Sequence, residues 1–324
     1  MTNSIKNEEK YYYPISTFYK QKFGEKVYKI PIGFASTCPN RDGFLDNKGC
    51  IYCGTTGGSF ENSKSDKSIF EQYETTKELI KKKYNAKLFI PYFMSYSNTY
   101  TDIDSFKNSF DEILALNESV GLSISTRPDL IFDDQLLYIK DNINNDYLVT
   151  FELGLQSVNN HTLEILNRKH YLSDFIDACF RIKSFGYRLC VHLILDLPWD
   201  NEIDIIEAAN IINVLNVDEV KIHSLYVVKG TQLAKLYQNN EIKLLTEMDY
   251  IKNVSVFLSY LNPQISISRI VGRAPEENTL YCNWNKSWWK IKEDLLNYME
   301  MQKLFQGKNY KKKGGNSYGK DHFR

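Results

Sequence analysis

Short apolar runs alternate along the chain with longer amphipathic stretches. The short runs are rich in β-branched and aromatic residues, and we expect strands at 27–32, 87–93, 121–125, 147–155, 189–195, 219–225 and 264–271. In the longer stretches an apolar residue returns every three or four positions. They predict helices at 68–84, 102–117, 134–143, 160–167, 173–185, 202–215, 231–238, 246–260 and 287–304.

The repeated strand–helix alternation predicts parallel βαβ units. Most of the expected strands are continuous apolar runs, which is typical of strands covered on both faces. An open doubly wound sheet and a barrel both fit, but no Walker loop or G-x-G-x-x-G motif follows a strand, and this weakens the nucleotide-binding open sheets. Polar residues gather at the expected carboxyl ends of the strands, at 95–99, 126–129, 156–157, 196 and 223, where a barrel places its functional residues.

The 324 residues carry 40 basic and 40 acidic side chains, so the formal net charge is zero. This balance excludes a strongly basic nucleic-acid binder, and we expect no DNA partner, but a local basic surface is compatible with it. No run approaches the roughly 18 apolar residues that a membrane-spanning helix needs. The polar N-terminus has no apolar segment of the signal-peptide type. We therefore expect a cytoplasmic protein without a membrane partner.

Three of the six cysteines, Cys38, Cys50 and Cys53, lie within one loop after the first expected strand. Cytosolic thiols stay reduced, so this cluster indicates metal or redox chemistry. Three thiolates are a complete protein set for a 4Fe–4S cluster with one open iron, an incomplete set for a structural zinc, or a redox pair with an extra thiol. The remaining cysteines, Cys179, Cys190 and Cys282, lie in apolar or aromatic segments and are expected to pack in the core.

The loop from Cys38-Pro-Asn-Arg-Asp-Gly43 to Gly49-Cys50-x-Tyr52-Cys53 resembles the cluster loop of the YhcC/YtqA-like radical S-adenosylmethionine (SAM) proteins, relatives of the elongator-type catalytic subunits. Further blocks agree in order at 93–100, 125–129, 152–157, 167–170, 220–223, 228–231 and 306–307. The resemblance covers about residues 10–307. It implies an α/β fold, a radical SAM partial (β/α)6 TIM-type barrel with a C-terminal extension. We expect a lead-in at 1–26, the barrel core at 27–240, a strand/helix extension at 241–306 and a basic, flexible tail at 307–324.

The resemblance also implies cofactors and site residues. Cys38, Cys50 and Cys53 hold a 4Fe–4S cluster whose open iron binds SAM, and an electron donor such as flavodoxin or ferredoxin drives cleavage to a 5′-deoxyadenosyl radical. Expected SAM contacts are Tyr52 near adenine, Ser95, Ser97 and Asn98 near the amino group, Glu152 and Gln156 near the ribose, and Arg168 at the carboxylate. Ser125 is a further expected cofactor-binding residue. Glu152 and Gln156 share a strand face by even spacing. Arg127, His192 and His223 are candidate substrate contacts. Each of these has a structural alternative, such as aromatic packing for Tyr52 or a surface ion pair for Arg168.

Three positions depart from the family pattern. Asp196 and Trp199 replace both glycines of a Gly-Leu-Pro-Gly turn, so the backbone there must avoid positive φ. Arg273 stands where relatives usually carry an acidic residue.

The resemblance points to a tRNA partner, with remodelling of the C5 side chain of the wobble uridine from carboxymethylaminomethyl to aminomethyl. The basic tail and Lys81–Lys83 are candidate phosphate contacts, and Trp284, Trp288 and Trp289 candidate stacking residues. A small-molecule or porphyrin-like substrate and a non-enzymatic, zinc-stabilised binding protein remain alternatives.

Overall fold

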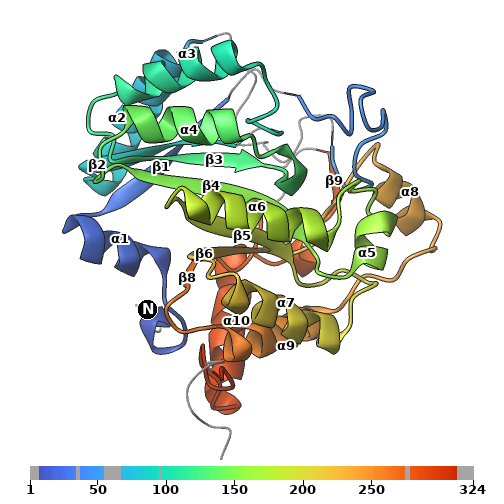
Figure 1. Cartoon of the computed structure of the whole chain (residues 1–324). Coiled ribbons are helices and arrows are strands. Elements are labelled where there is room, and N and C mark those ends of the chain that lie inside the picture. The colour runs from blue at the N-terminus through green and yellow to red at the C-terminus, as the bar shows by residue number, and fades with distance from the viewer. Residues whose placement is uncertain (1–6, 34–36, 55–66, 95, 274–277, 312–324) are drawn as a thin grey trace, which may run out of the picture.

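Seven parallel strands form one curved sheet in the computed structural model of the chain, which describes residues 7–33, 37–54, 67–94, 96–273 and 278–311 (Figure 1). Neighbouring strands follow chain order, as right-handed βαβ crossovers place them. From one edge to the other the strands are β1 (Val27–Ile32), β2 (Leu88–Phe93), β3 (Gly121–Thr126), β4 (Leu148–Gln156), β5 (Arg188–Ile194), β6 (Glu219–His223) and β8 (Ser266–Arg269). A separate antiparallel pair joins β7 (Val227–Val228) to β9 (Thr279–Tyr281).

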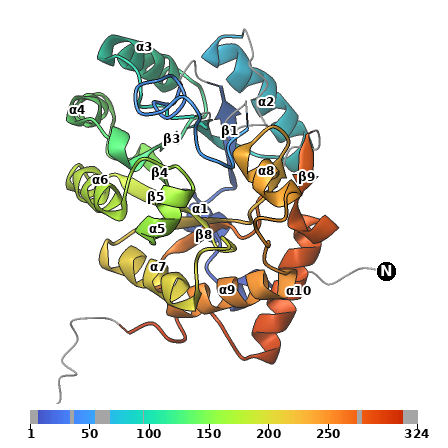
Figure 2. The same ribbon diagram turned by 90° about the vertical axis from the view of Figure 1, so that its right-hand side faces the viewer.

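The helices surround the strands in an arc when the sheet is viewed from its end (Figure 2). Capping boxes start several of them, for example Ser68 with Glu71 and Asn201 with Asp204, because these side chains satisfy the first backbone N–H groups. Within the described residues, the helices are α1 (Ile15–Phe23), α2 (Ile69–Tyr84), α3 (Ile103–Leu114), α4 (Asp133–Asn142), α5 (Asn160–Ile165), α6 (Leu172–Ser184), α7 (Glu202–Val214), α8 (Gln232–Gln238), α9 (Glu247–Tyr260) and α10 (Trp288–Met301).

The predicted fold class is confirmed: the sheet is a curled, half-closed barrel with helices on its outer side. One large core between strands and helices contains fully buried residues such as Phe89, Phe151 and Phe175. The strand expected at 264–271 is present as β8, which pairs with β6 and adds a seventh strand to the core sheet. No helix in the described ranges is both long and apolar enough to cross a bilayer.

The segment before β1 closes the gap between the two edge strands, β1 and β8. The backbone N–H of Ile267 donates to the carbonyl of Tyr13 over 2.8 Å, and Pro14 forms a parallel bridge with Ile267. Helix α1 then contacts both edges. Gln306 accepts from the N–H of Tyr13 over 2.9 Å, so the chain after α10 fastens this segment in place.

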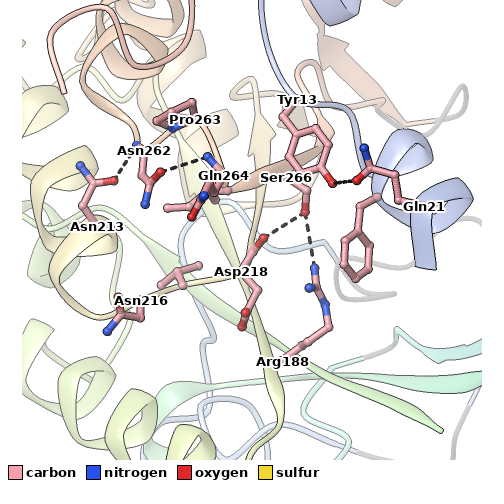
Figure 3. A pocket seen from close by; sticks show the side chains of 13 residues that line it. Tyr13, Gln21, Arg188, Asn213, Asn216, Asp218, Asn262, Pro263, Gln264 and Ser266 are labelled. Carbon is pink, nitrogen blue, oxygen red and sulfur yellow. Dashed lines mark hydrogen bonds between the residues drawn. The ribbon is translucent and has the colours of Figure 1, made fainter. Parts of the chain in front are cut away.

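A cavity of about 420 Å³ lies at the amino ends of the strands (Figure 3). Its wall includes Arg188, which begins β5, and Ser266, which begins β8. The Arg188 guanidinium lies 3.9 Å from the ring centre of Phe18 and donates to Ser266 Oγ over 3.5 Å. None of the candidate site residues lines this cavity, so the chemistry belongs to the opposite end of the sheet.

Candidate active site

A second pocket lies at the carboxyl ends of the strands, where the sequence places its functional residues. Of the predicted residues, it brings together Cys38, Cys50, Tyr52, Cys53, Ser97, Ser125, Arg127, Gln156, Arg168, His192 and His223. Glu152 and Asn98 do not line it, and Ser95 lies outside the described residues. Because a partial barrel converges its strand ends on one face, residues more than 150 positions apart meet here.

The cysteine loop is folded tightly by its own backbone. The N–H of Arg41 donates to the carbonyl of Cys38 over 2.8 Å, and that of Cys53 to the carbonyl of Cys50 over 3.0 Å. Asn40 donates from Nδ2 to the carbonyl of Asn167 over 2.6 Å and so ties the loop to the segment after α5. Cys50 is buried, and Cys38 and Cys53 are half-buried at the pocket.

Side-chain N–H groups point at two of the three sulfurs. Arg41 Nη1 lies 3.4 Å from Cys53 Sγ, and Arg168 Nη1 lies 3.4 Å from Cys50 Sγ. Burial, followed by the nearby Cys50, raises the pKa of the Cys53 thiol to about 11, and Arg41 opposes this rise. Donors to sulfur favour thiolates, which are the form that binds iron.

The number of thiolates in the loop favours a cluster over a single structural zinc ion. Among the described residues, the one set of at least three cysteine, histidine or carboxylate groups with ligand atoms all within 4.8 Å is Glu152, Cys190 and His192. The three loop sulfurs therefore spread wider than 4.8 Å. Three thiolates are a complete protein set for a 4Fe–4S cluster with one open iron, and they are one short of the four ligands of a structural zinc site.

Arg168 links the cluster loop to the end of β4. Its Nη1 also lies 3.4 Å from the hydroxyl of Tyr52, its Nη2 donates to the carbonyl of Gly154 over 2.7 Å, and its Nε donates to His170 over 3.1 Å. A Cβ added at Gly154 would lie 2.9 Å from Gln156 Nε2 and 3.2 Å from Arg168 Nη2. A larger residue at 154 would therefore require the flexible ends of Gln156 and Arg168 to shift within the pocket.

Glu152 lies in the sheet interior, below the pocket, and has no solvent exposure. Its Oε1 accepts from Lys29 Nζ and from Ser123 Oγ, each over 2.6 Å. Its Oε2 accepts from His192 Nε2 over 2.8 Å and from Lys221 Nζ over 3.0 Å. Because both carboxylate oxygens of Glu152 already accept two hydrogen bonds each, Glu152 positions His192 and Lys221, which line the pocket. The contact of Glu152 with the ribose of SAM remains a prediction. The two ammonium groups would also repel a cation bound by Glu152, Cys190 and His192.

Two histidines stand at the ends of neighbouring strands with ring centres 5.2 Å apart. Burial and Lys221 lower the pKa of His192 to about 4, although Glu152 opposes this. His192 is therefore neutral at pH 7, and since a carboxylate only accepts, its Nε2 carries the hydrogen. Burial and His192 also hold the pKa of His223 well below its ordinary 6.5. Both rings thus present uncharged nitrogens to a bound molecule.

Two other predicted residues each have a buried polar atom without a hydrogen-bond partner among the described residues: Ser97 Oγ and Arg127 Nη1. Arg127 fixes its other nitrogens on Asp129, with bonds of 2.9 and 2.8 Å. Unpartnered buried donors beside a pocket are groups that a ligand satisfies. Asn98 instead donates to the carbonyls of Phe93 and Ser125, over 3.1 and 2.7 Å, and so joins the ends of β2 and β3.

The departures from the family pattern have local explanations. Neither Asp196 nor Trp199 has positive φ, which confirms the prediction for the turn without glycines. Asp196 is buried, and its Oδ1 accepts from the N–H of Leu225 over 2.7 Å. Burial raises the pKa of Asp196 to about 7 despite this bond. Arg273 is exposed, and its guanidinium lies 5.1 Å from the ring centre of Trp288.

Sequence reasoning missed three charged residues that line the pocket: Arg41, Lys221 and Arg269. A signal existed for Lys221, because a lysine within the apolar strand 219–223 needs a buried partner. Lys81, one of the predicted phosphate contacts, instead forms an ion pair with Glu118 over 2.6 Å. Lys81 is near the C-terminus of α2, and because β2 follows α2, this pair lies at the amino ends of the strands, away from the pocket.

Comparisons with known proteins agree with this geometry. Residues 46–212 match the Radical SAM superfamily and residues 217–301 the Radical SAM C-terminal domain. YtqA of Bacillus subtilis is 31% identical over 94% of this chain and 95% of its own. A tRNA uridine(34) acetyltransferase of Methanocaldococcus jannaschii is 29% identical over 50% of this chain and 31% of its own. The structure of archaeal Methanocaldococcus infernus Elp3 with an N-terminal deletion superposes with a TM-score of 0.64, at 20% identity, over 86% of this chain and 64% of that one.

A half-closed parallel barrel with three cysteines on the loop after its first strand defines a radical SAM enzyme. The chain belongs to this superfamily and, within it, to the YhcC/YtqA-like family. Its cofactors are a 4Fe–4S cluster and SAM, which together supply a 5′-deoxyadenosyl radical. Cys38, Cys50 and Cys53 line the pocket, and their three thiol groups are the donor set that a 4Fe–4S cluster with one open iron would take.

Proposed function

We propose that this radical SAM enzyme acts on tRNA and remodels the C5 side chain of the wobble uridine from carboxymethylaminomethyl to aminomethyl. The radical that SAM supplies takes a hydrogen atom from the methylene carbon beside the carboxylate, and that carbon gives one further electron back to the oxidised cluster. Water then cleaves the bond between this carbon and nitrogen, so that the carboxymethyl group leaves as glyoxylate and the aminomethyl group remains. Support comes from the partial similarity to a tRNA uridine(34) acetyltransferase and from one feature of the pocket rim.

That feature is the exposed pair of Arg273 and Trp288, and it carries the proposal. Gly272, directly before Arg273, packs against the pocket: a Cβ added there would lie 3.4 Å from His223 Nδ1. Asn283 donates to the carbonyl of Gly272 over 2.9 Å and accepts from Ser224 Oγ over 2.6 Å, so the rim is held in place. Trp288 is 41% exposed. An exposed indole beside a guanidinium is a platform on which an unpaired base stacks.

Trp284 belongs to the fold rather than to this rim. Its Nε1 donates to the carbonyl of Leu245 over 2.9 Å, and its ring packs 5.1 Å from Tyr250. The neutral His192 and His223 suit a substrate side chain that carries its own charge, because they offer hydrogen bonds without adding repulsion. The zero net charge of the chain means that RNA binding rests on local groups such as Arg273.

Nucleoside mass spectrometry of tRNA from a deletion strain tests the proposal. We expect the carboxymethylaminomethyl nucleoside to accumulate at the wobble position, and a plasmid copy of the gene to reverse this. A Cys53→Ala copy, which removes a cluster ligand, should fail to reverse it. Wobble nucleosides that are unchanged in the deletion strain would refute the tRNA function.

A binding measurement tests the rim separately. Arg273→Glu should weaken tRNA binding at least tenfold, which corresponds to about 1.4 kcal/mol. Lys252→Glu, at an exposed position of α9, makes the same charge change away from the pocket and is the control. Equal losses for the two variants would mean that general charge, and not stacking at the rim, governs binding.

A further inference from the structure

The tip of the cysteine loop presents two apolar side chains to solvent. Phe44 is 74% exposed and Leu45 is 42% exposed. Both lie between the first and second cluster ligands, six and seven positions after Cys38. The ring of Phe44 approaches that of Tyr100 at a tilted angle, with 6.3 Å between the ring centres. Burial in the core therefore does not explain why this position holds a phenylalanine.

The loop holds these side chains out on a rigid frame. The N–H of Leu45 donates to the carbonyl of Pro39 over 2.8 Å, and that of Gly43 to the carbonyl of Asp46 over 3.1 Å. Asn167 Nδ2 donates to Asp46 Oδ2 over 2.9 Å and to the carbonyl of Gly49 over 2.8 Å. A surface fixed in advance loses little entropy when a partner binds, which is the property of a docking site.

Phe44 and Leu45, at the tip of the cysteine loop, lie outside the pocket. Cys38, Arg41, Cys50 and Cys53 line the pocket, whereas Phe44 and Leu45 do not. In Figure 2 the blue part of the loop between β1 and α2 overlaps β3 and α3 in the upper half of the view and lies nearer the viewer than α3, while α10, which begins at Trp288, lies at the lower right. A protein seated on the tip thus reaches the cysteine loop without covering the rim of Arg273 and Trp288.

The reaction itself requires such a partner. Reductive cleavage of SAM consumes one electron, which the cluster must receive from outside. The other cysteines of the chain give no second redox centre, because Cys179 and Cys190 are buried separately on α6 and β5, and Cys282 precedes a 3₁₀ turn. The electron must therefore come from a separate carrier that docks close to Cys38, Cys50 and Cys53.

We propose that Phe44 and Leu45, flanked by Lys48 and Lys169, form the docking surface for a small one-electron carrier protein with carboxylates around its redox centre. The carrier loses one electron and the cluster gains it. Lys169 is 44% exposed and forms an ion pair with Asp46 over 3.7 Å. Lys48 is exposed, as is Asp42, whose Oδ1 accepts from the N–H of Phe44 over 3.1 Å. The apolar pair supplies contact area, and the two lysines orient an acidic partner and speed its approach. This inference rests on the cluster and is independent of the tRNA substrate.

The test compares two reductants in the Phe44→Ala variant, with flavodoxin hydroquinone as the protein carrier and dithionite as the small one. By stopped flow without tRNA, we expect cluster reduction by flavodoxin to slow at least tenfold and reduction by dithionite to stay unchanged. Titration calorimetry should show at least tenfold weaker flavodoxin binding to the reconstituted protein. Phe180→Ala, which removes an aromatic that is 64% exposed on α6, is the matched control and should change neither quantity.

Three results would overturn the proposal. Unchanged reduction by flavodoxin shows that the carrier docks elsewhere. Equal slowing with dithionite shows that Phe44 supports the cluster and not the carrier. Weaker tRNA binding with normal electron transfer assigns the tip to RNA. Lys48→Glu adds a check on the charges, because it should slow flavodoxin most at low salt, where electrostatic steering is strongest.

Discussion

Replacement of Glu152 by glutamine tests the buried charge network below the pocket. The carboxylate accepts four hydrogen bonds of 2.6–3.0 Å from Lys29, Ser123, His192 and Lys221. A glutamine oxygen can replace one carboxylate oxygen, but its NH₂ group would face the N–H groups on the other side. Lys221, whose side chain is 10% exposed, then keeps only the hydroxyl of Tyr92, 3.0 Å away, as an acceptor.

The expected loss in the free energy of unfolding is about 3–5 kcal/mol at pH 7, the usual cost of leaving one member of a buried ion pair without its partner. Urea unfolding followed by tryptophan fluorescence measures it. Glu207→Gln, at an exposed position of α7, is the matched control and should stay within about 0.5 kcal/mol of the native chain.

The pH dependence gives a second check. Burial alone would raise the pKa of Glu152, but Lys221 and Lys29 outweigh burial and hold this pKa well below the ordinary 4.5. A carboxylate with a lowered folded pKa stabilises the protein above its unfolded pKa and loses that effect as pH falls through the folded value. The difference between native and variant should therefore be full at pH 7 and narrow below pH 4.5. A difference under 1 kcal/mol at pH 7 would refute the network as described.

Three further substitutions give direct expectations. The folded pKa of Asp196 is raised from 3.8 to about 7, so the native chain loses about 1.4 kcal/mol of stability for each pH unit between these values. Asp196→Asn should therefore unfold at a higher urea concentration than the native chain at pH 8 and at the same concentration at pH 3.5. Lower stability of the variant at pH 8 would contradict this. Gly154→Ala places a Cβ 2.9 Å from Gln156 Nε2, which is the end of a flexible side chain and can shift, so we expect the free energy of unfolding to change by less than about 1 kcal/mol, whereas a larger loss in thermal unfolding would show that the pocket holds Gln156 in place. Arg168→Ala should weaken SAM binding at least tenfold in equilibrium dialysis, with the surface variant Arg181→Ala as control; equal affinity would remove Arg168 from the SAM site.

The layout of strands and helices could be predicted because each buried strand is a continuous apolar run bounded by polar residues. Helix α1 and the β7–β9 pair were missed for a physical reason. Helix α1 has nine residues and is held by its contacts with β1 and β8, which are far apart in sequence. Strands β7 and β9 have two and three residues, too few for a period to be recognised.

The site was predicted unevenly. The spacing of Cys38, Cys50 and Cys53 located the cluster loop, but the choice between iron–sulfur and zinc needed the match to the radical SAM superfamily. Even spacing along a strand suggested one face for Glu152 and Gln156. The register of β4 against β5 shifts between Gly154 and Gln156, and Gln156 has φ of 72°, so only Gln156 lines the pocket. A β-bulge of this kind has no signature in the sequence alone.

Formation of 5′-deoxyadenosine tests the central claim most directly. The chain is reconstituted anaerobically with iron and sulfide, reduced with dithionite and incubated with SAM. We predict that the native chain and Cys282→Ala each form 5′-deoxyadenosine and methionine in equal amounts. Cys53→Ala should form neither product, because Cys53 lies in the cluster loop and Cys282 does not. No 5′-deoxyadenosine from a protein carrying its full iron and sulfide, or undiminished product from Cys53→Ala, would contradict the account.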